Sequence, residues 1–454
     1  AELKNMLGES NIKYSERPTT PPPRNFKGQE VLPQWHGPEE SKIDDWIYNL
    51  QNKQIDTKRV QEAIGDIEEN WNVYEKEQLY HGRTASGIRN FLLKELLPVI
   101  KEIERLKISP EEIRTYLHNR HAEERNIQMN KINPDVYDET TGRTIPNPLK
   151  DKGSGISTAD ARAYLAGLDP AKKQVFEQIA TKFDEMVKGT QQILINSGNE
   201  SAETIANWNK TYKHYVPLFR VEDEMARPSG MGGTGQGFGT RGNFSKRAMG
   251  SEKDVQDILS NIIAQRERAL IRAEKTRVGR ALYGMAIQNP NPDFWLPINP
   301  DAIRNKKQAI AELTRMGIPD AENVVNNLMA EPKERYLRKI NVAEGAVELD
   351  EDFDFDSGLP VNESKEVVAA KINVMARYKD YVFPVRINGK DRYIFFNKND
   401  PRALRMVQSL KNLDVENLGL ALSIAGKFTR WFKNVNTQYN PIFGLVNFVR
   451  DFSG

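Results

Sequence analysis

Two histidines and a glutamate lie at helical spacing in the first third of the chain. His118, His121 and Glu124 follow one another three residues apart, which places them on one face of a helix. Imidazole and carboxylate groups bind zinc, so this face could hold a metal ion. The spacing of a zinc hydrolase, with two histidines four apart and a glutamate between them, is absent. Arg120 and Arg125 would repel a cation, and we expect a polar network between helices rather than a metal site.

Other patterns that could support catalysis or nucleotide binding are incomplete. His81, in the motif Tyr80–Arg83, has no serine, aspartate or cysteine partner nearby, and its glycine explains the motif as a turn. The glycine pattern Gly237–Gly242 follows no predicted strand. Ala421–Phe428 lacks the first glycine and the final serine or threonine of a phosphate-binding loop. The sequence therefore predicts no enzymatic activity for this region, no metal site and no cofactor.

Basic residues gather in two neighbouring segments. The glycine density of residues 221–250 predicts a flexible arm, because glycine loses the most conformational entropy on ordering. From Arg227 onward the arm has no acidic residue, and a long basic helix follows it. Such segments suit phosphate groups, although Glu267 and Glu274 on the helix also fit side-chain pairing on a solvated face. The candidates for DNA contact are Arg241, Lys246, Arg247, Arg268, Arg272 and Lys275.

Composition limits the remaining classes of protein. The chain has 454 residues, of which 65 are basic and 63 acidic, so its net charge of +2 gives no general attraction to nucleic acid. Cysteine is absent, which excludes disulfides and thiolate metal sites. No segment has the roughly 20 apolar residues of a membrane span, and the start lacks the apolar region of a signal peptide. The non-methionine start and the apolar end lead us to expect a piece of a larger polypeptide.

Helical periodicity organises most of the chain. From about residue 40, apolar residues recur every three to four positions. Ser109–Glu112 predicts a helix start, with serine as the cap and proline at the first position. Asn133–Gly155 is predicted as a loop, and Asn388–Gly389 as the turn of a β-hairpin. The predicted fold is mainly α, an elongated multi-helix assembly with one late β-hairpin insertion and a Gly-rich arm.

We predict six segments along the chain. They are an extended proline-rich tail (1–38), a helical domain (39–220), the flexible basic arm (221–250), a long basic helix with short helices (251–343), an acidic loop with the β-hairpin (344–400) and a C-terminal helical segment (401–454). Aromatic and basic residues mix in the last segment, where Phe428, Trp431 and Phe432 are candidates for a membrane interface. A packing helix is the favoured alternative for this stretch.

Several short motifs resemble a family of large phage proteins. The segment around Pro217 resembles the PLxRFG type, and the histidine motifs upstream of it fit the same group. The last motif resembles a domain of large polyvalent proteins of phages and conjugative elements. Val221 and Glu222 depart from the family, which has Phe and Gly at these positions. The residues that carry the resemblance are His81, Arg83, His121, Arg125, Asn126, Pro217, Leu218, Arg220, Asn440, Pro441, Asn447, Arg450 and Asp451.

The resemblance implies a structural internal virion protein, or ejection protein, of a tailed, short-tailed phage. Such a protein helps to form an internal core or a trans-envelope conduit (an ejectosome) for genome delivery. It implies a place in the virion interior, and in the host periplasm or inner membrane after ejection. The expected partners are further copies of the chain as a homo-oligomer, other virion or portal and tail proteins, double-stranded DNA and the host envelope membrane.

Two alternatives remain open beside this function. One is a helical module of a DNA-escorting polyvalent protein that binds nucleic acid or acts as an effector in the recipient cell. The other is a non-catalytic region that flanks a virion-carried enzyme.

Overall fold

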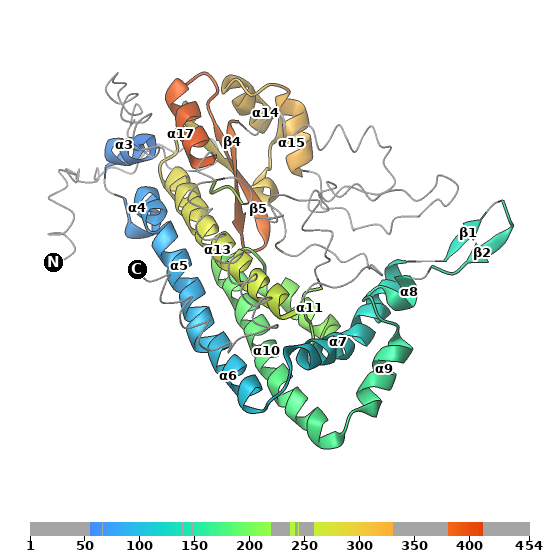
Figure 1. The fold of residues 1–454 in the computed structure, drawn as a ribbon. Helices are drawn as coiled ribbons and strands as arrows, with labels where there is room; N and C mark the ends of the chain where they lie inside the picture. Colours follow the sequence, from blue (N-terminus) through green and yellow to red (C-terminus); the bar gives the residue numbers. More distant parts are fainter. Residues whose placement is uncertain are drawn as a thin grey trace.

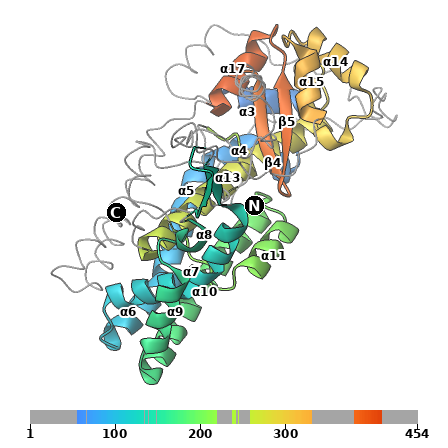
Figure 2. The same ribbon diagram turned by 90° about the vertical axis from the view of Figure 1, so that its right-hand side faces the viewer.

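Helices, a three-stranded sheet and a two-stranded hairpin make up the described part of the chain (Figure 1). The structure is a computed structural model, and it describes residues 55–65, 67–133, 135–138, 140–147, 149–218, 237–240, 244, 258–329 and 380–411. The fold is mainly α with a late β-hairpin, which confirms the predicted class. Figure 2 shows the sheet and its helices at one end and the long helices extending from it.

The helices and strands follow one another in this order. The α-helices are α3 (Ile55–Ile64), α4 (Val73–Gln78), α5 (Tyr80–Asn90), α6 (Leu97–Arg105), α7 (Pro110–Ile132), α8 (Leu149–Lys152), α9 (Thr158–Gly167), α10 (Pro170–Ser197), α11 (Ala202–Thr211), α13 (Ile258–Gln288), α14 (Lys306–Arg315), α15 (Ala321–Met329) and α17 (Pro401–Lys411). The short helices are the 3-10 turns η1 (Glu69–Trp71) and η3 (Pro300–Ala302) and the π-helical η2 (Phe91–Leu96). The strands are β1 (Val136–Asp138), β2 (Arg143–Ile145), β3 (Trp295–Ile298), β4 (Val382–Ile387) and β5 (Lys390–Phe396).

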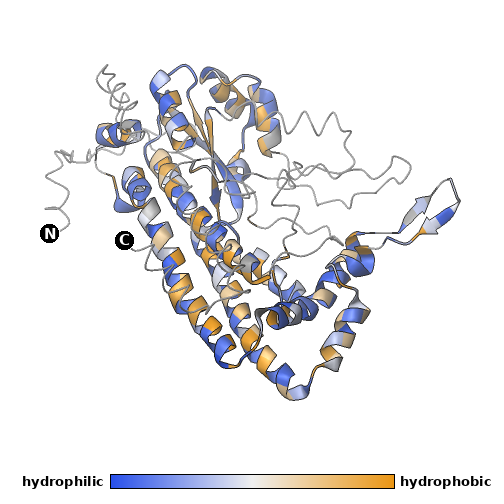
Figure 3. Ribbon diagram, in the orientation of Figure 1, coloured by the Kyte–Doolittle hydropathy of each residue, from blue (hydrophilic) through white to orange (hydrophobic). Residues whose placement is uncertain are grey.

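The helix α13 connects two hydrophobic cores. Its first half, with Leu259 and Ile262, packs in one core with η2, α6, α7 and α10. Its second half, with Leu282 and Met285, packs in another core with α3, α4, the sheet and α17. Figure 3 shows hydrophobic and hydrophilic residues mixed along α13. Because α13 is covered on most sides, its polar residues must find partners inside the protein.

The late hairpin forms one edge of a three-stranded antiparallel sheet. Asn388 and Gly389 have φ angles of 50° and 73°, as the two central residues of this turn type require, so the predicted turn is confirmed. The strand order is β3-β5-β4. The strand β3 was not predicted. It contains Pro297, a residue that disfavours a strand but is tolerated at the edge of a sheet. A third core lies between this sheet, α14 and α15.

The predicted loop from Asn133 to Gly155 contains regular structure. β1 and β2 pair antiparallel, with Tyr137 opposite Thr144, and α8 follows them. Figure 1 shows this hairpin projecting from the end of α7. At its base, the Asp135 carboxylate accepts hydrogen bonds from the Asn147 backbone N–H at 3.1 Å and from Lys150 Nζ at 2.8 Å. The prediction of a plain loop is therefore wrong.

Part of the glycine-rich arm is packed into the second core. Phe238 is 3% exposed and Thr240 is 2% exposed. The Phe238 N–H donates to the Leu410 carbonyl at 2.9 Å, and the Thr240 N–H donates to the Pro384 carbonyl at 3.0 Å. The segment thus runs along the outer edge of β4. The predicted flexibility is wrong for residues 237–240, and the rest of the arm lies outside the described residues apart from Phe244.

The glycine at position 237 is required by a close approach of two backbones. Its φ is +65°, and a Cβ at this position would fall on the backbone of Leu410 and Lys411. Gly237→Ala should therefore lower the free energy of unfolding by about 1–3 kcal/mol, measured by urea unfolding. Gly82→Ala is the matched control, because a Cβ there meets nothing within 4 Å and alanine favours the helix. A Gly237→Ala protein as stable as the wild type would contradict this.

Candidate functional site

Two of the motifs that carry the resemblance, around His121 and around Pro217, meet at one place, between α7, α10 and the segment 212–218. α7 begins at a full capping box, in which Ser109 Oγ accepts from the Glu112 N–H at 3.2 Å and the Glu112 carboxylate accepts from the Ser109 N–H at 3.0 Å. This confirms the predicted helix start. The helix carries His118, His121 and Asn126 along its length, and segment 212–218 lies beside it after α11.

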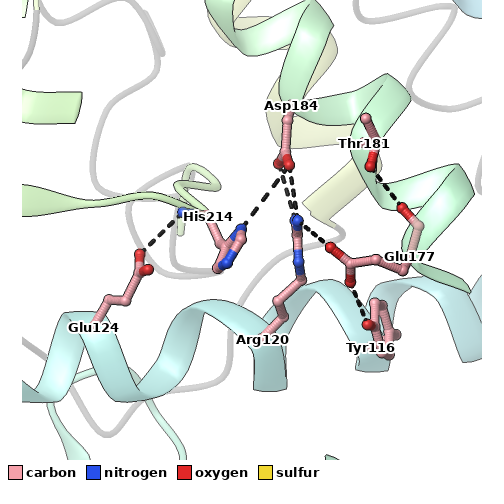
Figure 4. A network of polar contacts seen from close by, with 7 residues as sticks. All are labelled: Tyr116, Arg120, Glu124, Glu177, Thr181, Asp184 and His214. Atoms are coloured by element: carbon pink, nitrogen blue, oxygen red, sulfur yellow. Dashed lines mark hydrogen bonds and ion pairs between the residues drawn. The ribbon is translucent and has the colours of Figure 1, made fainter. Parts of the chain in front are cut away.

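A charged network joins α7 to α10 (Figure 4). Arg120 Nη2 donates to Glu177 Oε1 at 2.6 Å and to Asp184 Oδ2 at 2.9 Å, and its Nη1 donates to Asp184 Oδ1 at 3.0 Å. Tyr116 Oη donates to Glu177 Oε2 at 2.5 Å. The Arg120 side chain is 8% exposed and that of Asp184 is 16% exposed. The guanidinium therefore holds two carboxylates one helical heptad apart on α10.

The charges of this network stabilise one another. Burial alone would lower the pKa of Arg120, but the hydrogen bonds and charges of Asp184 and Glu177 outweigh it, so the pKa of Arg120 is raised. Burial acts to raise the pKa of Glu177, yet Tyr116 and Arg120 hold that pKa below its ordinary value. Arg120 and Glu177 therefore stay ionised near neutral pH, as a structural ion-pair network requires. Neither is a neutral acid or a free base.

The same network fastens segment 212–218. The His214 N–H donates to Glu124 Oε2 at 3.0 Å, and His214 Nδ1 lies 4.0 Å from Asp184 Oδ2. On the other side of the segment, Asn261 Nδ2 of α13 donates to the Pro217 carbonyl at 3.0 Å. Val216 is 2% exposed. The segment is thus a strap that links α7, α10 and α13.

His121 lies at the buried centre of the contact between α7 and the strap (residues 212–218). Its side chain is 0% exposed, and its ring lies 5.5 Å from that of Tyr212 and 5.7 Å from that of Tyr215, centroid to centroid. Neither ring nitrogen has a hydrogen-bond partner of standard geometry among the residues that the structure describes. Burial, followed by the charge of Arg125, lowers the pKa of His121 well below its ordinary value. His121 is therefore a neutral packing residue.

The depressed pKa of His121 predicts a loss of stability in acid. The unfolded chain binds a proton at this residue near pH 6.5, whereas the folded chain resists it. The contribution of the neutral ring is therefore complete above pH 6.5 and is lost as the pH falls towards the folded pKa. His121→Phe keeps an aromatic ring without a titrating group, so its unfolding free energy in urea should fall less than that of the wild type between about pH 7 and 5. Parallel pH profiles of the two proteins would exclude this role.

Polar residues of α7 also fasten the loop before α9. Asn126 Oδ1 accepts from the Ser154 N–H at 3.0 Å, and its Nδ2 donates to the Ile156 carbonyl at 2.9 Å. His118 Nε2 lies 2.9 Å from the Ser154 carbonyl oxygen. The expected polar network is thus present for His118 and Glu124, whereas His121 packs against aromatic rings. Among the described residues, no group of three or more histidine, aspartate and glutamate side chains is arranged to hold a metal ion.

Two of the predicted DNA-contact residues are in the interior. Arg272 and Lys275 are each 1% exposed; Arg272 Nε donates to Asn199 Oδ1 at 2.8 Å, and burial, followed by the charge of Arg272, lowers the pKa of Lys275 to about 8. The prediction that they reach phosphates is wrong, because α10 and the sheet cover this side of α13. Arg268 is half-buried.

The remaining sequence candidates are spread over the chain. Arg83 is half-buried on α5, and for His81 only the backbone, in α5, is described. Leu218 packs against the first core. No helix in the described ranges combines the length and apolar composition of a membrane span. Outside the described residues lie Arg220, Arg241, Lys246, Arg247, Phe428, Trp431, Phe432, Asn440, Pro441, Asn447, Arg450 and Asp451.

The carboxylates that complete the network, Glu177 and Asp184, were not predicted from the sequence. Glu177 and Asp184 lie seven residues apart on the mostly apolar buried side of α10. Two acids at heptad spacing beside an apolar stripe were a usable signal, because such positions lie next to a neighbouring helix. The partner, Arg120, could not be assigned from spacing alone, since it lies on another helix.

Comparison with known proteins identified no relative of the chain. No protein-family model, no curated protein and no solved structure matches the chain.

Proposed function

We propose that this chain is a non-enzymatic, helical structural protein of a tailed phage virion, an internal protein that helps to deliver the genome. The observation that carries the proposal is the position of the motif residues. His121 is buried under the strap, Asn126 fastens a loop, and the Pro217 carbonyl accepts from Asn261 of α13. Three of the residues that carry the resemblance thus lie at contacts that hold neighbouring segments together.

Joints of this kind suit an assembly protein better than an enzyme. A catalytic group must touch a substrate from a cleft, and His121 does not reach solvent. A shallow depression between the end of β5 and α17 is lined by polar residues such as Asp293, Asn399 and Arg402. Its acid Asp400 is paired with Arg402 at 2.9 Å. The depression offers no nucleophile with an adjacent base.

The test is whether the chain is part of the particle. Mass spectrometry of purified, DNA-filled virions should detect its peptides, and particles that have ejected their DNA in vitro should have lost them. Imaging of the particle interior should then show further copies of the chain around a common axis. Filled virions that lack the chain would refute the proposal.

A further inference from the structure

One continuous helical rod presents a face of a single charge sign. α5, η2 and α6 follow one another without a break from Tyr80 to Arg105, at the outer side of the helical body (Figure 1). Leu92, Leu96 and Ile100 point into the first core. The side chains on the opposite face are exposed. The exposed positions of the rod and of the turn after it are Gly82, Ser86, Arg89, Asn90, Lys94, Pro98, Lys101, Arg105 and Lys107.

The charges on this face are all positive. We call Arg89, Lys94, Lys101, Arg105 and Lys107 the α5–α6 basic face. None of these five side chains takes part in an ion pair or a side-chain hydrogen bond in the part of the chain that the structure describes. The same rod carries three acids of intermediate exposure, Glu95, Glu102 and Glu104. Two of them are held by other helices.

These acids are directed away from the basic face. Glu95 pairs with Arg266 of α13 at 2.6 Å, and Glu102 pairs with Lys182 of α10. By contrast, α10 exposes both signs, with Glu185 beside Lys188. Other helices thus neutralise two of the three acids of the rod, and the five exposed cations have no partner among the described residues, which raises the local positive potential despite a net charge of only +2.

The spacing of the cations matches an extended polyanion. Lys94, Lys101 and Arg105 stand at i, i+7 and i+11, which share one side of a helix. With a rise of about 1.5 Å per residue, the row from Lys94 to Arg105 is roughly 16 Å long. Duplex DNA advances about 3.4 Å per base pair, so the row runs beside about five base pairs, and Arg89 is exposed next to it. The long side chains of lysine and arginine can reach its phosphates.

We propose that the α5–α6 basic face binds the phosphate backbone of duplex DNA without reading its sequence. An anionic membrane is the less suitable partner, because a helix that lies in a membrane interface needs large apolar side chains beside its cations. The exposed uncharged residues of the rod are Gly82, Ser86, Asn90 and Pro98, which offer no such anchor. The proposal goes beyond a place in the virion, since a particle protein need not touch DNA.

The test compares two variants of the full chain with equal changes in charge. One carries Arg89→Gln, Lys94→Gln, Lys101→Gln and Arg105→Gln. The control carries Lys173→Gln, Lys210→Gln, Lys213→Gln and Lys307→Gln, which are exposed positions on α10, at the end of α11, in the segment 212–218 and on α14. Glutamine has a helix propensity close to that of lysine and arginine, so thermal unfolding should be unchanged in both.

Binding is measured by fluorescence anisotropy with a labelled duplex of about 20 base pairs, over about 25 to 200 mM salt. Each lost phosphate contact should flatten the slope of log affinity against log salt by about 0.9. The basic-face variant should therefore lose roughly 3 to 4 from this slope and more than tenfold in affinity at low salt, while the control keeps both. The virion test above is independent of this result.

Three outcomes would overturn the proposal. The first is a wild-type chain that does not bind the duplex at low salt. The second is an equal loss in both variants, which would indicate general charge attraction. The third is a basic-face variant that binds DNA normally but no longer binds phosphatidylserine vesicles, which would make the face a membrane contact.

Discussion

Replacing Arg266 with alanine should lower the free energy of unfolding by about 2–4 kcal/mol. Arg266 lies on α13 and is 4% exposed. Its Nη1 and Nη2 donate to the two carboxylate oxygens of Glu95 at 3.1 and 2.6 Å, and its Nε donates to Thr190 Oγ1 at 2.8 Å. One guanidinium therefore joins α13 to both η2 and α10, and its loss removes charge-assisted hydrogen bonds that water cannot readily replace.

The surroundings of Arg266 are built for a planar guanidinium. Its Cζ lies 4.6 Å from the centre of the Phe91 ring, and Nη2 also donates to the Met186 carbonyl at 2.7 Å. A Cβ on Gly189 would lie only 2.5 Å from Nη2. Phe91 and Glu95 both belong to η2, and a π-helical turn often marks a specialised contact. The Glu95 side chain is 40% exposed, so most of the cost comes from lost packing and hydrogen bonds.

Arg277→Ala is the control for the removal of an arginine from α13. Its side chain is 51% exposed and pairs at 3.3 Å with Glu274, whose side chain is 13% exposed; because Arg277 itself is solvated, its loss should cost about 1 kcal/mol. Arg266→Lys should lie between the two, because lysine keeps the charge but cannot make a bidentate, stacked contact. Urea unfolding of the three variants checks the order. Equal stabilities of Arg266→Ala and Arg277→Ala would exclude this role of Arg266.

Local signals in the sequence predicted local structure well. The capping box at Ser109 and the turn at Asn388–Gly389 are specified by neighbouring residues, because the hydrogen bonds and φ angles concerned lie within a few positions. The apolar side of α10, with Phe176 and Phe183, was also predicted. Each of these features depends on chemistry that acts over one or two helical turns.

The interior of the protein was harder to predict, because burial depends on distant segments. The basic residues of α13 suggested a solvated, phosphate-binding face, yet Arg272 meets Asn199, 73 residues away in the sequence. Periodicity shows which residues share a face, not which faces are covered. The sequence did contain one indication that this part of α13 is buried. Apolar residues alternate with its charged residues, and these apolar residues, Ala269, Ile271 and Ala273, are all buried. Apolar residues all round a helix indicate burial on all sides.

The predicted flexibility of the glycine-rich arm was wrong at residues 237–240 for a related reason. Glycine density measures the entropy cost of ordering the chain, but it does not measure what the chain can gain by packing. Phe238 contributes a buried ring, which lies 5.2 Å from that of Tyr80 in an edge-to-face contact. The absence of a Cβ at Gly237 lets the backbone reach α17. At this position the glycine allows two backbone segments to lie close together, and it does not only make the chain flexible.

A buried acid on α13 should make stability depend on pH. Glu267 is 6% exposed, and its Oε1 has no hydrogen-bond partner in the described part of the chain. Burial raises the pKa of Glu267 to about 8, and the nearby charge of Arg268 opposes this shift only in part. The folded chain therefore holds the proton near neutral pH, whereas in the unfolded chain the same carboxyl titrates near pH 4.5.

The sign of the effect follows from this difference. A folded pKa above the unfolded value gives a contribution that is complete below pH 4.5 and is lost as the pH rises through about 8. One pKa unit corresponds to about 1.4 kcal/mol, so the unfolding free energy should fall by roughly 4 kcal/mol over this window. His121 acts in the opposite direction, since its contribution is lost as the pH falls below 6.5. Each residue must therefore be studied through its own variant.

Glu267→Gln should remove the loss at high pH. Glutamine has nearly the same shape as protonated glutamate and does not ionise, so the variant should match the wild type near pH 5 and exceed it by roughly 2–4 kcal/mol near pH 8. Glu185→Gln, at an exposed position of α10, is the control and should follow the wild-type curve throughout. Urea unfolding at several pH values gives the difference curves. If the Glu267→Gln and wild-type curves stay parallel from pH 5 to 8, then Glu267 is ionised in the folded chain, and a cation or water must reach its carboxylate.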